Sequence, residues 1–301
     1  MKTNLDCIPC FTRHTLEAAR TLNLNDADAA QLMIDVIKLI LRLDWQQPPP
    51  VMARDIHRLI KTQTGNSDPY APHKQHTTQT ALKLLPDIQR IVREAKQPFK
   101  MAVRFAIAGN AIDLGAKTMN QIDISAIFKS AQHAPLDDTA VNRLEAQINA
   151  ARNILFLADN AGEVVFDLPL LEWIGPQKVT VVVRGEPVIN DAVMEDARRA
   201  GICERFKVIS NGADTPGTWL ADCSPEFVRA FSAADLVIAK GQGNYETLND
   251  AAHNLFFLFM AKCPVIAEDA GVPLQSYVVI DTLSRQNQKM NETYPRQNVS
   301  R

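Results

Sequence analysis

Four short segments in the second half of the 301-residue chain combine residue types that bind cations and phosphate groups. Each follows an apolar, strand-like run, and together they offer carboxylates, carboxamides and one ammonium, with neither histidine nor cysteine. In an open parallel sheet, ligands bind beyond the carboxyl ends of the strands, so the four segments should meet in space. This set suits a hard divalent cation and a phosphate group better than zinc. The segments are Asp159–Glu163, Asn190–Asp191, Asn211–Asp214 and Lys240–Asn244.

The first segment, Asp159-Asn160-Ala161-Gly162-Glu163, has the most specific pattern. Asp159 and Asn160 supply two successive oxygen ligands, and Gly162 permits a tight turn into the next helix. Glu163 then falls in the first helical turn, where a carboxylate complements the helix dipole. A plain helix N-cap is the alternative interpretation, but it explains only one of the two polar residues. We therefore predict that this segment is part of a metal site.

Asp191 is the third candidate ligand. It follows the second predicted strand by way of Arg184–Pro187 and lies near the start of a predicted helix. On its own, a helix cap and an oxygen ligand explain it equally well. The neighbouring motif favours the ligand, because an Asp/Asn/Asp set leaves room for water and a substrate phosphate.

Lys240 ends a strand-like run and precedes the glycine-rich stretch Gly241–Gly243. Loop amides and a following helix N-terminus could receive an anion there, with the lysine as a point charge. The order differs from that of a P-loop, and no Gly-x-Gly-x-x-Gly occurs, so dinucleotide binding has no support. Asn110 is polar within an apolar run, and a helix cap and a substrate contact remain equally open for it.

Hydrophobic periodicity divides the chain into two halves. Helical spacing dominates residues 1–150, with a buried, alanine-rich helix expected at Phe99–Gly109. Over residues 151–284, short β-branched runs alternate with helical segments, which predicts an α/β, Rossmann-like, mostly parallel sheet flanked by helices. Residues 285–301 form a polar tail that we expect to be disordered. The predicted strands are Ile154–Ala158, Val179–Val183, Lys207–Ser210, Leu236–Ala239, Pro264–Ala267 and Tyr277–Ile280, and the predicted helices of this half lie near Val164–Trp173, Ile189–Ala200, Pro225–Ala230 and Asn244–Met260.

Composition excludes several classes of protein. A net charge of −2 provides no field for gripping nucleic acid or an anionic membrane surface. The longest apolar stretch, Leu255–Met260, is too short to span a bilayer, and the amino terminus does not resemble a signal peptide. We expect a cytoplasmic protein. The five cysteines are an odd number, and we interpret Cys7 and Cys10, a Cys-x-x-Cys pair without a second pair, as buried structural thiols.

Together these motifs resemble the damage-control phosphatases, the ARMT-like metal-dependent family long catalogued as a domain of unknown function. The likeness spans nearly all of the chain except the tail. The early Cys-x-x-Cys makes the chain similar to the stand-alone microbial branch. The matching segments are Cys7–Cys10, Asp68–Tyr70 with Lys74, Gly109–Asp113, Asp159–Glu163, Arg184–Asp191 and Lys240–Asn244.

The resemblance implies an α-helical amino-terminal region packed on the α/β domain. It also implies one divalent cation (Mn, Mg, Co or Ni) held by Asp159, Asn160 and Asp191, and hydrolysis of small phosphorylated metabolites such as sugar phosphates or damaged phospho-metabolites. Lys240 matches the phosphate-contacting lysine of the family, and Glu163 and Asn110 match positions that line its pocket. We assign catalytic roles to Asp159, Asp191 and Lys240, and substrate-binding roles to Asn110, Glu163, Arg184, Lys240, Gly241 and Asn244.

The working hypothesis is metal-assisted phosphomonoester hydrolysis, in which the cation and Lys240 withdraw charge from the phosphoryl oxygens. Whether Asp159 attacks phosphorus or only holds the metal and its water is open at this point. The alternatives are a non-catalytic sensor of a phosphorylated metabolite and a carboxyl methyltransferase, although no glycine-rich adenosyl-methionine motif follows the first strand. The expected partner is a small phosphorylated metabolite, with no nucleic acid and no membrane, and homo-oligomer formation is compatible with the sequence.

Overall fold

The computed structural model describes residues 1–111 and 124–282, and it describes no side chain from 110 to 128. The predicted tail at 285–301 and the side chain of Asn110 lie outside this description. Among the described residues, no helix is both long and apolar enough to cross a membrane.

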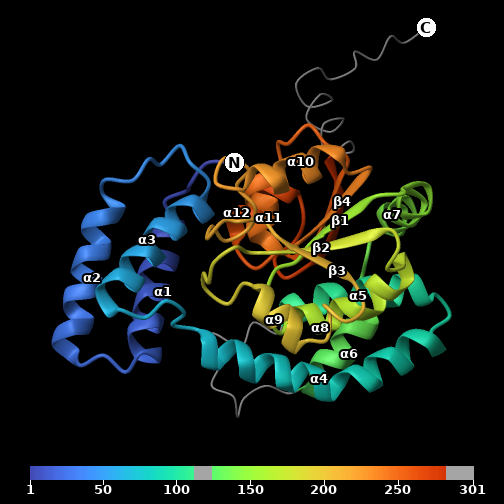
Figure 1. The fold of residues 1–301 in the computed structure, drawn as a ribbon, viewed down its shortest axis with the longest axis horizontal. Helices are drawn as coiled ribbons and strands as arrows, with labels where there is room; N and C mark the ends of the chain where they lie inside the picture. The colour runs from blue at the N-terminus through green and yellow to red at the C-terminus, as the bar shows by residue number, and fades with distance from the viewer. Residues whose placement is uncertain (112–123, 283–301) are drawn as a thin grey trace, which may run out of the picture.

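A six-stranded sheet forms the centre of the molecule, in the order β3-β2-β1-β4-β5-β6 (Figure 1). Strands β1 to β5 run parallel, and β6 pairs antiparallel with β5. The predicted mostly parallel, Rossmann-like sheet is therefore confirmed. The chain winds outward in both directions from β1 and β4, which makes their junction the topological switch point. The strands are β1 (Ile154–Leu157), β2 (Val179–Val183), β3 (Lys207–Ser210), β4 (Leu236–Lys240), β5 (Leu255–Met260) and β6 (Tyr277–Asp281).

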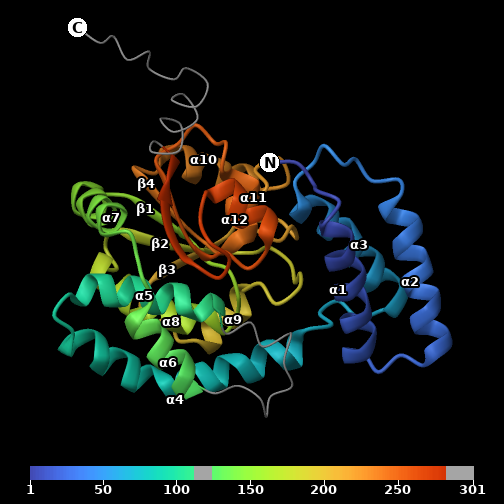
Figure 2. The ribbon, with the colours of Figure 1, turned by 180° about the vertical axis from the view of Figure 1, so that it is seen from behind.

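Both faces of this sheet are buried, as expected of parallel strands covered by helices. Alternate residues of β1 point to opposite faces, so Ile154 and Phe156 join one hydrophobic cluster while Leu155 and Leu157 join the other. Helices α4, α5, α7 and α8 contribute to the first cluster, and α10, α11 and α12 contribute to the second (Figures 1 and 2). Helices α1, α2 and α3 form a third cluster beside the sheet. The helices are α1 (Cys7–Thr21), α2 (Asp26–Ile40), α3 (Pro49–Thr64), α4 (Ala71–Glu94), α5 (Pro98–Ala111), α6 (Ile124–His133), α7 (Asp138–Ala150), α8 (Glu163–Ile174), α9 (Met194–Arg199), α10 (Pro225–Ala233), α11 (Gly241–Leu248) and α12 (Pro264–Ala270).

The division of the chain at residue 150 stays a prediction. The hydrophobic clusters group the helices in a different way, since α4, α5 and α7 share their core with the sheet, whereas α1, α2 and α3 form a separate core among the described residues. The buried helix expected at Phe99–Gly109 is present as α5, and Phe105 within it is completely buried.

Two elements predicted in the last third of the chain were wrong. The helix predicted at Asn244–Met260 is the short helix α11 followed by strand β5, and the strand predicted at Pro264–Ala267 is helix α12. The run Leu255–Met260 lies between β4 and β6 and is buried on both faces, so every position is apolar. A continuous apolar run has no period to separate strand from helix.

The helix predicted at Ile189–Ala200 begins later than expected, at Met194. Residues before it form an irregular loop in which Ile189 has a positive φ of 45°. That loop carries Asp191, so the late start of α9 leaves this side chain at the edge of the sheet instead of inside a helix.

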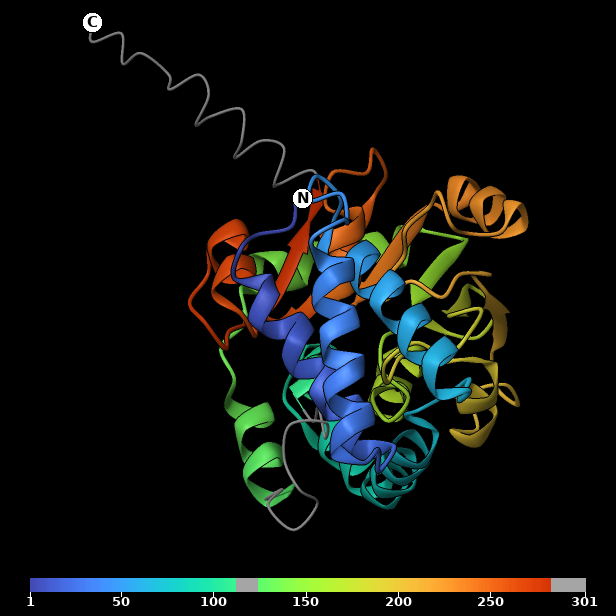
Figure 3. The same ribbon diagram turned by 90° about the vertical axis from the view of Figure 1, so that its left-hand side faces the viewer.

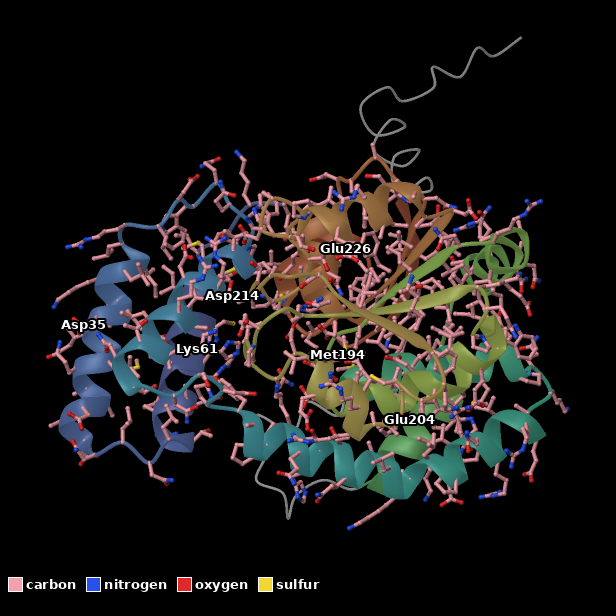
Figure 4. The ribbon with its side chains drawn as sticks, viewed as in Figure 1. Asp35, Lys61, Met194, Glu204, Asp214 and Glu226 are labelled. Carbon is pink, nitrogen blue, oxygen red and sulfur yellow. The ribbon has the colours of Figure 1, made fainter. Side chains whose placement is uncertain are left out.

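Helix α3 attaches the amino-terminal helices to the loops beyond the sheet. The Arg58 guanidinium donates two hydrogen bonds to the Asp214 carboxylate, at 2.6 and 2.8 Å. Lys61 donates to the carbonyl of Pro187 at 2.9 Å and lies 4.0 Å from Asp214 (Figure 4). Arg54 pairs with Asp222 further along the same helix face. The amino-terminal helices therefore border the carboxyl edge of the sheet.

The core under the sheet predicts a large effect for Phe105→Ala. Removing this completely buried ring should lower the free energy of unfolding by about 3–5 kcal/mol, because the transfer and cavity terms add. Leu274→Ala is the matched control, since Leu274 is 49% exposed, and it should change the free energy by less than about 0.5 kcal/mol. Urea denaturation followed by circular dichroism measures both, and equal effects would contradict the assignment of this core.

Candidate functional site

The candidate site lies at the switch point between β1 and β4. Asp159 follows β1, and Lys240 is the last residue of β4, which is paired with β1. Gly241 adopts a φ of +78°, and a Cβ at this position would overlap the Asp159 carboxylate. The carboxylate therefore lies directly against the start of the glycine-rich loop, and only glycine satisfies both the backbone conformation and the contact.

The three predicted cation ligands come from two loops that are hydrogen-bonded to each other. Asn160 and Asp191 form an isolated antiparallel bridge. On either side of it, the amide of Ala161 donates to the carbonyl of Asn190 at 2.9 Å, and the amide of Ala192 donates to the carbonyl of Asp159 at 2.7 Å. These main-chain bonds bring Asp159, Asn160 and Asp191 together, as the sequence predicted for the segments that carry them.

Arg184 is the buried cation beside this set. Its Nε donates to Asp191 Oδ2 at 2.7 Å, and its Nη2 lies 4.0 Å from Asp159 Oδ1. Its Nη1 and Nη2 reach Thr218 Oγ1 and Asn244 Oδ1, both at 3.5 Å. The side chain is only 1% exposed, so its hydrogen bonds orient Asp191 and connect it to the neighbouring loops.

Lys240 occupies an environment that the sequence did not indicate. Its ammonium is completely buried and donates to Glu163 Oε1 and to the carbonyl of Ala106, both at 2.7 Å, and to Asp167 Oδ1. An ammonium has three donors, and all three are used within the protein. Burial alone would lower the pKa of Lys240, but Asp167 and Glu163 reverse this and raise it. The direct phosphate contact predicted for Lys240 stays a prediction. In this structure its ammonium bonds to two carboxylates and one main-chain carbonyl.

The carboxamide of Asn160 links this buried network to the ligand set. Its Nδ2 donates to Asp159 Oδ2 and to Glu163 Oε2, both at 2.9 Å. The hydrogens of the amide therefore face carboxylates, and its oxygen is the atom left to coordinate a cation. Hydrogen bonds therefore connect Asp167 to Lys240, Lys240 to Glu163, and Glu163 to Asn160. Asn160 in turn bonds to Asp159.

Asn244 and Thr218 hold two loops against each other. Asn244 Nδ2 donates to the carbonyl of Lys240 at 2.7 Å, and its Oδ1 accepts from Thr218 Oγ1 at 2.7 Å. Gly217 has a φ of +78° and lies so close to Gly243 that a Cβ would collide with its carbonyl. The side chains of Asn244 and Thr218 are completely buried, so Asn244 has a structural role in joining these loops. Its predicted role in substrate binding stays a prediction.

The first turn of α4, together with the turn before it, supports the loop that carries Asp191. Lys74 is buried and pairs with Asp68 at 2.9 Å and Asp196 at 2.8 Å. Asp196 also accepts from the amide of Val193 at 3.0 Å, which fixes the start of α9 directly after Asp191. The Asp-Pro-Tyr segment and its lysine thus have a physical role in positioning a candidate ligand.

The third predicted segment, Asn211–Asp214, shapes the loops instead of joining the ligand set. Asn211 Oδ1 accepts from the amides of Gly185 at 3.1 Å and Ala213 at 2.9 Å. The Asp214 carboxylate is occupied by Arg58. The segment lies at the same edge of the sheet as predicted, and it bridges the loop after β2 and helix α3.

Burial and mutual repulsion perturb the candidate ligands. The pKa of Asp159 lies well above its ordinary value, mainly through burial and then through the charges of Glu163 and Asp191. Burial also raises the pKa of Asp191, although Arg184 opposes the shift. Lys262, after the end of β5, acts on Asp159 in the opposite direction. Carboxyl groups with pKa values raised in this way hold their protons more tightly, and a further positive charge nearby would favour their ionised forms.

A count of buried charges tests whether a divalent cation fits. If all four buried carboxyl groups are ionised, they carry four formal negative charges against the two positive charges of the buried cations, and one divalent ion would neutralise the difference. The raised pKa values of Asp159, Asp167 and Asp191 mean that, without such an ion, bound protons neutralise part of this charge. Two carboxylates and one carboxamide oxygen are ligands that hard cations accept. No group of three or more His, Cys, Asp or Glu side chains in the described part of the chain has the geometry of a metal site. The proposed set differs from such a group, because its third ligand is the carboxamide of Asn160. The charged residues counted are Asp159, Glu163, Asp167, Asp191, Arg184 and Lys240.

Sequence reasoning missed Asp167 and Lys262. Asp167 lies four residues after Glu163 on α8, so the two carboxylates share one helix face. It interrupts an otherwise apolar run, which was an available signal. Lys262 follows the strand that the sequence mistook for a helix, so its position at the carboxyl edge of the sheet could not be recognised.

The buried network predicts a pH-dependent stability for Asp167→Asn. Burial raises the pKa of Asp167 from 3.8 to about 7, with Lys240 opposing and Glu163 adding to the shift. Because the folded protein binds this proton more tightly, the stability that Asp167 contributes is present below pH 4 and is lost as the pH rises through 7. The stability of the wild type relative to Asp167→Asn should fall by more than about 1 kcal/mol over this window. Urea unfolding in chelator at several pH values measures the difference, and a flat difference would contradict the shift.

The contact between Gly241 and Asp159 predicts that Gly241→Ala destabilises the folded protein by more than backbone strain alone would. Gly271 also has a positive φ, of +66°, but a Cβ added to it would meet nothing within 4 Å, so Gly271→Ala reports the strain without a collision. Gly241→Ala should lower the free energy of unfolding by about 1–3 kcal/mol more than this control. Urea denaturation measures both variants, and equal losses would show that the carboxylate moves aside freely.

Comparison with known proteins agrees with the fold and identifies the family. Residues 3–278 match the family model of the damage-control phosphatase ARMT1-like domain. The chain is 34% identical to the damage-control phosphatase PH1575 of Pyrococcus horikoshii, covering 91% of this chain and 96% of the relative. It is 32% identical to a damage-control phosphatase of Archaeoglobus fulgidus, covering 90% and 96%.

A solved structure gives the same result. The crystal structure of a DUF89 family protein, PH1575 of Pyrococcus horikoshii, superimposes with a TM-score of 0.84 at 32% identity, covering 94% of this chain and 99% of that one. Both the sequence and the three-dimensional fold therefore match over almost their full lengths. The chain belongs to the ARMT1-like family of damage-control phosphatases.

Proposed function

We propose that this phosphatase-family protein is a metal-dependent phosphomonoesterase that hydrolyses small phosphorylated metabolites. One divalent cation would be held by Asp159, Asn160 and Asp191. The observation that carries the proposal is the gathering of four buried carboxyl groups around two buried cations at the switch point, with the pKa values of Asp159, Asp167 and Asp191 raised. Such a cluster is costly to bury, and a divalent cation that binds a phosphate group would stabilise its ionised form.

The cation, when bound, would supply electrophilic stabilisation of a phosphoryl group. The residues of the chain supply the positioning. Arg184 holds Asp191 by its 2.7 Å hydrogen bond, and Glu163 together with Asp159 fixes the carboxamide of Asn160. These contacts hold the groups before substrate arrives, which is most of what a protein offers in phosphoryl transfer.

The sequence predicted that Lys240 contacts the phosphate group, whereas we propose separate roles for Lys240 and Lys262. In its buried position Lys240 keeps Glu163 in place through a 2.7 Å ion pair. Lys262 is half-buried and close enough to Asp159 to lower its pKa. We therefore propose Lys262 as a cation that faces the site, and Lys240 as a positioning residue with a charge-balancing role.

The test is phosphate release by protein that has been stripped of metal and reloaded with Mg²⁺, Mn²⁺, Co²⁺ or Ni²⁺. Substrates are p-nitrophenyl phosphate and then a panel of sugar phosphates. Asp159→Ala should reduce turnover at least about a thousandfold. Asp235→Asn is the matched control, because this carboxylate accepts amide hydrogen bonds from Arg152 and Asn153 at the opposite edge of the sheet. Its turnover should be unchanged.

Thermal unfolding supplies a second measurement on the same samples. The cation should raise the midpoint of the wild type and of Asp235→Asn but not that of Asp159→Ala, since a ligand that binds only the folded state stabilises it. Stabilisation without phosphate release would favour the non-catalytic sensor. Full turnover in folded Asp159→Ala would overturn the site assignment.

A further inference from the structure

Helix α2 exposes a stripe of apolar side chains with regular spacing. Its members alternate at intervals of three and four residues, the spacing of one face of a coiled coil. Ile34 is 47% exposed, Ile37 is 46% exposed and Leu41, at the carboxyl cap, is 77% exposed. The stripe consists of Ala27, Ala30, Ile34, Ile37 and Leu41, all of them exposed.

The core of the chain does not require this stripe. The buried side of α2 consists of Leu32, Val36 and Ile40, which pack in the cluster shared with α1 and α3. At 100° per residue, the mean direction of these three positions lies about 140° around the helix from that of the stripe. Figure 3 views the molecule from the α2 side and shows no described element over the helix. A continuous exposed apolar face of this kind marks an interaction surface.

We propose that α2 is the interface of a homodimer, in which the helices of two copies pair antiparallel across a two-fold axis. In that arrangement Ile34 of one copy lies opposite Ile37 of the other, and Ala30 lies opposite Leu41. Small side chains then face large ones in the outer layers, which allows close packing. A two-fold axis makes the stripe its own partner.

Charge complementarity favours a second copy in this orientation. The amino-terminal end of α2 carries Asp26 and Asp28, and Arg42, one residue after the cap, is the cation at its carboxyl-terminal end that faces them in an antiparallel pair. Lys38 is paired with Asp35 of the same helix at 3.1 Å. Asp44 follows Arg42 in the chain, so the charge complementarity depends on Arg42. Antiparallel pairing places Arg42 of each copy beside the acidic amino-terminal end of the other, whereas parallel pairing places the two acidic ends side by side. The helix dipoles favour the same orientation.

The size of the surface sets the expected strength. Fifteen residues of helix span about 22 Å, so a single helix pair lies at the low end of the area that specific interfaces bury. We therefore expect a concentration-dependent dimer with a dissociation constant in the micromolar range.

Sedimentation equilibrium of the full chain over a range of concentrations tests the proposal. Ile34→Glu places a carboxylate in an apolar layer, and the two-fold axis repeats it in the second copy. The dissociation constant should therefore rise at least about a hundredfold. Leu274→Glu is the matched control, since Leu274 is 49% exposed but lies outside α2, and it should dimerise as the wild type does. Circular dichroism and urea unfolding establish that each variant is folded.

A charge exchange tests the orientation. Arg42→Glu should weaken an antiparallel dimer, because the new carboxylate lies beside the acidic end of the other copy, and adding Asp26→Lys in the same chain should restore it. In a parallel pair each end of α2 lies beside the same end of the other copy, so Asp26→Lys could not compensate for Arg42→Glu. Failure of the second substitution to restore dimerisation would therefore overturn the proposed orientation. A wild type that stays monomeric at about 100 μM, or a folded Ile34→Glu variant that dimerises normally, would overturn the interface itself.

Discussion

The burial of four carboxyl groups at the junction of β1 and β4 is the constraint on which the rest of the site depends. Asp159, Glu163, Asp167 and Asp191 are all buried there; Arg184 and Lys240 are the buried cations that pair with them directly, and Lys74 is buried nearby. Burying carboxylates costs free energy unless charges or hydrogen bonds replace water. The surrounding structure supplies part of that replacement, through the bond from Arg184 to Asp191 and the pairing of Lys240 with two carboxylates. The part it leaves unbalanced is the basis for proposing a divalent cation.

The loops that carry these groups are held from both sides. Main-chain hydrogen bonds join the loop after β1 to the loop after β2, and Lys74 fixes the beginning of α9 through Asp196. On the other side, Arg58 joins α3 to Asp214. The amino-terminal helices are thus a structural part of the site's border, and an interface on α2 would place the two-fold axis on the far side of those helices from the sheet.

Lys240 shows how burial changes the meaning of a motif. A lysine before a glycine-rich loop indicates phosphate binding when its side chain reaches solvent. Here the ammonium is completely buried and uses its three donors on Glu163, Asp167 and a main-chain carbonyl. The loop after it still meets Asp159, because Gly241 permits a contact that no side chain would allow. Membership in a phosphatase family and this geometry are compatible, and we propose that the lysine acts on the site through its neighbours.

The sequence by itself determined the alternating α/β half, the mostly parallel sheet and the positions of Asp159, Asn160 and Asp191 after their strands, because strand-end polar residues and β-branched runs are local patterns. Tertiary structure decided what local patterns do not contain. Leu255–Met260 became a strand because neighbours on both sides pair with it, and α9 began late because the loop around Asp191 is bonded to Asn160. Asp167 and Lys262 joined the site from an apolar helix and a misassigned strand. Their proximity to Lys240 and Asp159 arises from long-range packing, which spacing along the chain does not encode.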